Sequence, residues 1–161
     1  MATWSDVLAA APELAARVQA RFEEHGLGLL ATVRRDGFPR ISGIEPLFAG
    51  GELWLGMMPE SRKAKDLLRD PRFSLHNATI DKNVAQGDAR ITARGVLADD
   101  EETLARFREA FEAHNGYPPP PEPFPLFRAD VYEVSMIQPA GDHLNIDWWR
   151  EGSEVVRVER R

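Results

Sequence analysis

A cluster of basic residues between Glu60 and Arg72 is the strongest chemical signal in the sequence, because the chain as a whole is acidic. The 161 residues carry a formal net charge of −6, whereas this segment holds five cations and three acids. Two of the cations, Arg62 and Lys63, directly follow Ser61, a residue type that often caps a helix start. A helix start is already positive, so each added cation costs roughly 0.3–1 kcal/mol unless an anion is present. The pattern predicts a site for a phosphate group.

The alternative interpretation is a solvated helix surface. Asp66 and Asp70 would then be local partners of the basic side chains, and surface ion pairs of this kind contribute little to stability. The residue pattern alone leaves both interpretations open.

The composition limits the class of protein. A chain of 161 residues with 43% hydrophobic content suits a single domain over residues 1–161. The absence of cysteine excludes disulfides, thiolate metal sites and a cysteine nucleophile. The four histidines lack metal-ligand spacing, so we expect no metal site. The acidic charge argues against nucleic-acid binding, and no signal peptide or apolar run of membrane-spanning length is evident, which favours a soluble cytoplasmic protein.

Hydrophobic periodicity and turn residues predict the elements that position the basic cluster. We expect helices over about 5–24, from Ser61 to the Asp70-Pro71 pair, and from an Asp99/Glu102 capping box to Asn115-Gly116. Within the second helix, Ala64, Leu67 and Leu68 are expected to be the buried stripe. Expected strands are two runs within 26–48 around the Asp36-Gly37 turn, then 52–57, 72–77, 88–98, 128–138, 142–149 and 153–159.

About eight strands and three helices, dominated by hairpins, indicate an α+β fold with an antiparallel β-barrel and peripheral helices. The segment YPPPPEPFP at residues 117–125 cannot form a helix or a central strand. We interpret it as a lid or a loop at a dimer edge, with a ligand for an aromatic groove as the alternative.

Three stretches resemble the pyridoxamine 5′-phosphate oxidase-like family of flavin-binding split β-barrels. They are LLATVRRDGFPRISGI, LWLGMMPESRKAKDLLRDPRFSL and DARITARGVLADDEE. The resemblance covers about Leu27 to Phe111 and is weaker as far as Trp149. It implies a homodimer that binds flavin mononucleotide (FMN) at the subunit interface and transfers hydride to or from a small organic substrate. In such an oxidoreductase the cofactor performs the chemistry, so we expect no catalytic side chain.

The resemblance also implies a set of cofactor-binding residues. The helix start Ser61, Arg62 and Lys63 would bind the FMN phosphate. The strand after the Asp36-Gly37 turn would run along the isoalloxazine ring, and the residues before the phosphate helix would line the cofactor. These positions are Arg40, Ser42, Gly43 and Ile44, and Gly56, Met57 and Met58, respectively.

Two further positions are implied from later strands. Arg90 would place a cation near the pyrimidine end of the ring and stabilise the reduced flavin, with an ordinary surface residue as the alternative. Trp149 is expected to face the flavin of the partner subunit. Alternation puts it on the polar face of its strand with Asp147, whereas Trp148 falls on the opposite face.

The sequence also departs from the family. Where true pyridoxamine phosphate oxidases have an arginine-x-histidine-x-arginine segment, this chain has REGSEVVRVERR, so we do not expect the vitamin B6 reaction. Bacterial relatives that use the deazaflavin coenzyme F-420, and relatives that hold flavin or haem without turnover, are alternatives. A purely structural barrel is a further one. The arginine- and alanine-rich composition fits a bacterium of high GC content; the substrate and the direction of the reaction stay open.

Overall fold

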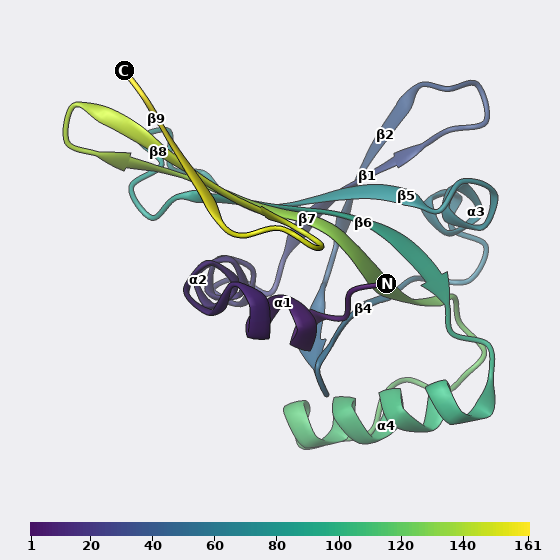
Figure 1. The fold of residues 1–161 in the computed structure, drawn as a ribbon. Coiled ribbons are helices and arrows are strands. Elements are labelled where there is room, and N and C mark those ends of the chain that lie inside the picture. Colours follow the sequence, from purple (N-terminus) through teal and green to yellow (C-terminus); the bar gives the residue numbers. More distant parts are fainter.

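The computed structural model describes residues 1–161 as one antiparallel sheet of nine strands with four helices around it (Figure 1). The predicted α+β fold class is confirmed, and the barrel is split because the sheet does not close. The helices are α1 (Trp4–Ala10), α2 (Pro12–Glu23), α3 (Arg62–Arg69) and α4 (Glu101–Asn115). The strands are β1 (Gly28–Val33), β2 (Pro39–Ile44), β3 (Leu47–Ala49), β4 (Glu52–Gly56), β5 (Arg72–Asn77), β6 (Asp88–Leu97), β7 (Leu126–Ala140), β8 (His143–Arg150) and β9 (Val156–Arg160).

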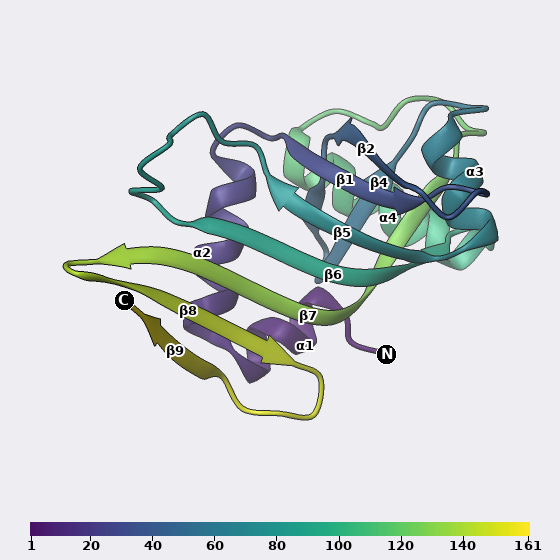
Figure 2. The same cartoon turned by 90° about the horizontal axis from the view of Figure 1, so that it is seen from above.

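Strand β7 divides the sheet. One of its edges pairs with β6, whereas the other pairs with β4 at its start and with β8 from Glu133 onward. Between these two partners Tyr132 is an extra residue at a shift in the β6 register, and such a bulge bends a strand. The N-terminus fills the gap, because the Val131 amide donates to the Ala2 carbonyl at 2.9 Å. As a result β8 and β9 form a ribbon that leaves the barrel (Figure 2).

The two edges of the barrel are brought together by a very short connection. The strand order is β2-β1-β5-β6-β7-β4-β3, so β2 and β3 lie at opposite ends of the sheet. Only Glu45 and Pro46 join them, and the sheet must therefore curl until its ends approach. The second of the two strands predicted within residues 26–48 is interrupted at this connection and forms both β2 and β3. The structure therefore has nine strands rather than the predicted eight. No backbone pairing joins β2 to β3, so β2 keeps one free edge.

The N-terminal helix differs from the prediction of one helix over residues 5–24. It breaks at Ala11, whose φ of −141° and ψ of 61° are not helical, and Pro12 begins a second helix. Proline suits the first helical position because a backbone N–H at that position has no acceptor within the helix, so its absence costs no hydrogen bond. Val18 and Phe22 of α2 are buried in the main core against the sheet. None of the four helices is long and apolar enough to span a lipid bilayer.

Helix α4 packs on a separate, smaller core. Phe107 of this helix is buried with Trp54 and Leu126 at the β4 and β7 end of the barrel. The N-cap is Asp100, whose side chain accepts from the Thr103 amide at 2.8 Å, rather than Asp99 as predicted. Asp99 therefore lies one residue before the cap and does not cap the helix.

Helix α3 begins and ends where the sequence predicts, after Ser61 and at Asp70. Its buried face is different, however. Leu67 is buried, but Leu68 is 59% exposed and Asp66 is only 3% exposed. The helix lies at the edge of the barrel, beside the β1–β2 hairpin (Figure 1), and turns Asp66 toward that hairpin. The predicted burial of Leu68 is therefore wrong.

The two adjacent leucines provide a direct test of how α3 is docked. Replacing Leu67 with Ala should lower the free energy of unfolding by about 2–5 kcal/mol, because a buried side chain leaves a cavity. Leu68→Ala, the matched control, should change it by less than about 0.5 kcal/mol. Urea unfolding of both variants measures the difference, and equal losses would contradict this orientation of the helix.

Candidate cofactor site

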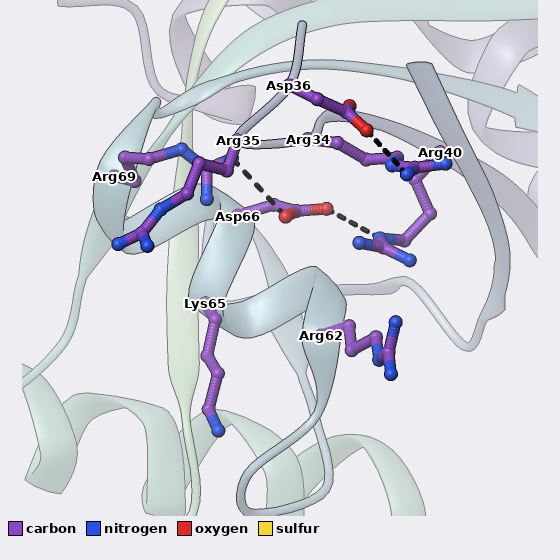
Figure 3. Close-up of a pocket in the computed structure, with 8 residues that line it drawn as sticks. All are labelled: Arg34, Arg35, Asp36, Arg40, Arg62, Lys65, Asp66 and Arg69. Atoms are coloured by element: carbon purple, nitrogen blue, oxygen red, sulfur yellow. Dashed lines mark hydrogen bonds and ion pairs between the residues drawn. The ribbon is translucent and has the colours of Figure 1, made fainter. Parts of the chain in front are cut away.

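A basic cavity of about 430 Å³ lies between the β1–β2 hairpin and α3 (Figure 3). Six cationic side chains and two carboxylates line it, and none of the lining residues is hydrophobic. The lining residues are Arg34, Arg35, Asp36, Arg40, Arg62, Lys65, Asp66 and Arg69. A net charge of +4 in this volume, within a protein at −6, makes the cavity a candidate anion site.

Local structure explains how these side chains meet. Four of the lining residues come from α3: Arg62 and, three, four and seven positions after it, Lys65, Asp66 and Arg69. At these spacings they share one helix face. The hairpin residues come from both sides of the Asp36-Gly37 turn. Gly37 has a φ of +85°, a left-handed conformation that glycine adopts readily. The predicted hairpin turn thus brings its flanking arginines to α3.

Asp66 is the centre of this arrangement. Its carboxylate accepts from Thr32 Oγ1 at 2.8 Å, from Arg40 Nε at 2.7 Å and from Arg69 at 3.3 Å. Figure 3 shows it between the side chains of Arg40 and Arg69. Burial disfavours the charged form, but the hydrogen bonds from Arg40, Thr32 and Arg69 outweigh it and keep the pKa of Asp66 below its usual value. Asp66 therefore stays ionised and ties α3 to β1 and β2.

The remaining charges of the cavity are unevenly paired. Asp36 accepts from Arg34 at 2.6 Å, and Lys65 pairs with Glu60 at 2.6 Å. Arg35 and Arg62 have no acidic partner within 4.0 Å. Both carboxylates of the cavity are thus already engaged by other arginines. An unpaired guanidinium such as that of Arg62 suits an oxyanion, since arginine can donate two parallel hydrogen bonds to phosphate.

The predicted phosphate-binding residues divide between two sides of the helix start. Arg62 lines the basic cavity, and Ser61 caps α3 by accepting from the Ala64 amide at 3.4 Å. Lys63 instead donates to the Gly43 carbonyl of β2 at 2.6 Å. Burial lowers the pKa of Lys63, with Glu45 acting in the opposite direction. An anion placed near this ammonium would restore its preference for the charged form.

The residues predicted to line the cofactor ring lie close to this helix start. Arg40 lines the basic cavity. On the same strand, β2, Ser42 is half-buried and Gly43 is exposed to solvent. Ile44 and Met57 are buried in the core, with exposed fractions of 4% and 5%. Gly56, Met57 and Met58 line a second, apolar cleft rather than the basic cavity. The predicted residues therefore occupy two neighbouring places joined by the strand β2 and the start of α3.

Arg90 and Trp149 lie outside the basic cavity. Arg90 is an exposed residue of β6 that pairs with Glu133 at 3.2 Å. Trp149 is 2% exposed within the main core, so its predicted position on an open polar face is wrong. Asp147, a polar residue on the same face, is also buried and forms ion pairs with Arg17 and Arg157. The half-buried tryptophan is Trp148, whose ring lies under a guanidinium.

Several residues of the cavity were not among those predicted from the sequence. Arg34, Arg35 and Arg69 were not predicted, and Asp66 was considered a surface partner. The helical spacing of Arg62, Lys65 and Arg69 is a signal that could have identified one face of the cavity. The position of the hairpin opposite that face is a tertiary feature with no local signal.

An open antiparallel barrel with a basic cavity beside a helix start defines a split-barrel protein with a candidate anion site. Residues 14–138 match the pyridoxamine 5′-phosphate oxidase family. This match covers most of the 161 residues, and the chain belongs to that family. The family predicted from the sequence is thereby confirmed.

Solved structures show the same fold. A pyridoxamine 5′-phosphate oxidase-related, FMN-binding protein from Nostoc punctiforme has 17% identity and a TM-score of 0.66, covering 100% of this chain and 98% of that chain. PhzG from Burkholderia lata, in complex with tetrahydrophenazine-1-carboxylic acid, has 15% identity and a TM-score of 0.63, covering 98% and 95%. A haem-binding protein from Mycobacterium smegmatis has 23% identity and a TM-score of 0.56, covering 84% of this chain and 57% of that chain. At these identities the similarity concerns the fold alone.

The role of Asp66 can be tested by removing its charge. Asp66→Asn should lower the free energy of unfolding by about 1–3 kcal/mol at neutral pH, because Arg40 and Arg69 would lose their anionic acceptor. Since the pKa of Asp66 is lowered in the folded protein, its contribution is complete above the ordinary aspartate pKa of about 3.9 and is lost as the pH falls through the lowered value. Urea unfolding should show the two proteins converging below about pH 4.

Asp70→Asn is the matched control for this experiment. Asp70 contacts Arg72, which is outside the basic cavity, at 2.6 Å. Its substitution should destabilise the protein less than Asp66→Asn does. Similar losses in the two variants at neutral pH would show that Asp66 has no special place in the structure.

Proposed function

We propose that this protein binds FMN with the phosphate in the basic cavity, and that it acts as an oxidoreductase on a small organic substrate. The observation that carries the proposal is the Arg62 guanidinium, which has no acidic partner within 4.0 Å in a cavity whose carboxylates are already engaged and which lies on the same side of Asp66 as Arg40 (Figure 3). Membership of the pyridoxamine 5′-phosphate oxidase family and the fold shared with an FMN-binding protein support the choice of ligand.

The donors present fit a flavin phosphate. Arg62 and Arg40 would bind the phosphate oxygens, and the free N–H groups at the start of α3 would add to the positive potential. The unpaired edge of β2 leaves alternate backbone groups between Arg40 and Ile44 available for the polar edge of the ring, apart from the Gly43 carbonyl, which accepts from Lys63. Ser42 and Gly43 would therefore lie along the ring.

A bound flavin would supply hydride transfer, and the residues of the chain would supply its binding and orientation. Arg62 and Arg40 would hold the phosphate end, so the position of the ring along β2 would be determined by that contact. Arg90 and the tryptophans of β8 lie away from the basic cavity within one subunit. We propose that any contact they make with flavin occurs across a homodimer.

Exposed apolar side chains on the barrel edge support the homodimer. Leu29 and Ile41 lie on the same outward face of β1 and β2 and are 45% and 72% exposed. A second copy packed on this face would remove them from water. Light scattering should therefore give a mass of about twice the 18.1 kDa of one chain, and a mass of one chain at micromolar concentration would contradict the dimer.

A deazaflavin coenzyme is the first alternative, because a phosphate group would suit the same cavity. A haem- or flavin-holding protein without turnover is the second, and the fold shared with a haem-binding protein supports it. The absorption spectrum of the purified protein and the mass of its released ligand distinguish the three. We expect the purified protein to show a flavin spectrum and to release a ligand with the mass of FMN. We also propose that the protein is bacterial and cytoplasmic.

Reversing the charge of Arg62 tests the phosphate assignment. Arg62→Glu should weaken FMN binding about ten- to a hundredfold, because a charge-assisted contact becomes a repulsion. Binding of riboflavin, which lacks the phosphate, should change much less. Quenching of flavin fluorescence on titration with protein measures both affinities.

The matched control is Arg72→Glu, which makes the same charge change outside the cavity at an exposed residue paired with Asp70. It should leave both affinities nearly unchanged. If Arg62→Glu weakened FMN and riboflavin equally, or if both variants behaved alike, the phosphate would not lie in this cavity.

A further inference from the structure

A second cleft, of about 540 Å³, is lined by residues from the end of β4, from helix α4 and from the proline-rich loop that leads to β7. Helix α4 and this loop run beside each other below the sheet (Figure 1). The walls of the cleft are mainly aromatic and apolar, with Trp54, Phe107, Phe111 and Phe124 among the lining residues and three prolines of the loop beside them. The volume is in the range typical of small-molecule pockets, which are mostly apolar with few polar groups. Its composition is opposite to that of the basic cavity.

The aromatic rings form a connected wall. The Phe107 ring lies 5.3 Å from Trp54, 5.6 Å from Phe111 and 6.1 Å from Phe124 by centroid distance, in tilted or edge-to-face geometry. The indole N–H of Trp54 is engaged, because it donates to the Ala49 carbonyl at 3.0 Å. Trp54 and Phe107 are themselves buried, so the half-buried rings of Phe111 and Phe124 are the ones that a guest would contact. These rings offer apolar surface rather than hydrogen bonds, which suits a planar apolar guest.

The charge of the cleft narrows the class of guest. Glu45 is the one charged residue that lines it, and it has no ion-pair partner within 4.0 Å. No lysine or arginine lines the cleft. A carboxylate of this kind attracts a cationic group and repels an anionic one. An anionic guest is thus disfavoured here, in contrast to the basic cavity.

The position of the cleft connects it to the proposed cofactor site. Glu45 directly follows the last residue of β2, and its charge partly offsets the burial that lowers the pKa of Lys63 at the start of α3. Gly56 and Met58, at the other side, lead from β4 toward the same helix start. A molecule in the cleft would therefore lie beside the free edge of β2, where we place the flavin ring.

We propose that this cleft binds the organic substrate, a planar aromatic or otherwise apolar molecule that is neutral or positively charged. The reaction of that molecule rests on the proposed function, but its binding does not require a flavin. The proline-rich loop would form one wall of the substrate site, which gives a specific role to the segment interpreted from the sequence as a lid.

A matched series of naphthalene compounds tests the chemical class in the full-length protein without added cofactor. The probes are 2-naphthylmethylammonium, 2-naphthalenemethanol and 2-naphthoate, which differ in charge but share one ring system. With saturating inorganic phosphate present to compete for the basic cavity, isothermal titration calorimetry should show that the ammonium and the alcohol bind, and that the carboxylate binds about five- to tenfold more weakly than the ammonium. A carboxylate that bound as tightly as the ammonium would overturn the proposal.

Two variants locate the binding. Glu45→Gln, an exposed substitution, should remove the difference between the ammonium and the carboxylate. Phe111→Ala should weaken all three probes about tenfold through the lost aromatic contact, with its folding checked by thermal unfolding. Phe38→Ala, at a 68% exposed aromatic residue of the β1–β2 hairpin, is the control and should change nothing. A charge difference that persisted in Glu45→Gln would place the probes elsewhere.

Addition of FMN separates this inference from the proposed function. FMN should leave the naphthalene affinities unchanged or increase them, because the phosphate and the ring are placed outside the cleft. Displacement of the probes by FMN would show that the cleft holds the cofactor itself and would overturn the substrate assignment. If FMN did not bind at all, the proposed function would fail while the naphthalene series still reported on the cleft.

Discussion

The arrangement of the basic cavity depends on one buried carboxylate. Six cations in about 430 Å³ would repel one another, and Asp66 limits that repulsion by accepting hydrogen bonds from Arg40 and Arg69 as well as from Thr32. These donors come from β1, β2 and α3, so the same carboxylate also fixes the helix against the hairpin. Because it satisfies only part of the positive charge, the cavity stays attractive to an anion.

The topology of the sheet explains why two unlike sites lie side by side. No backbone pairing joins β2 to β3, so the barrel stays open and β2 remains an edge strand. The short connection through Glu45 then brings the end of β2 beside the end of β4. The basic cavity lies on the hairpin side of α3, and the apolar cleft lies on the side of β4 and α4. The proposed cofactor, with its charged end, and the proposed apolar substrate would thereby bind in separate places.

Features with a local physical cause were predictable from the sequence. Ser61 was correctly expected to begin a helix because its hydroxyl caps the first turn, and the Asp36-Gly37 turn was recognised because glycine adopts a positive φ. Features that depend on distant contacts were not. The exposure of Leu68 follows from where α3 meets the hairpin, and the burial of Trp149 follows from its pairing opposite Val134 of β7. In the same way, the role of Asp66 was hidden because its partners Thr32 and Arg40 are more than twenty residues away.

We propose that the positive charge around Arg62 holds a flavin phosphate. Crystals of the protein grown with FMN test this proposal most directly, because the phosphorus atom can be located in the electron density. We predict that the phosphate lies at the start of α3, with oxygens accepting from the guanidinium groups of Arg62 and Arg40. A flavin bound with its phosphate elsewhere and with Arg62 directed into solvent would contradict the account.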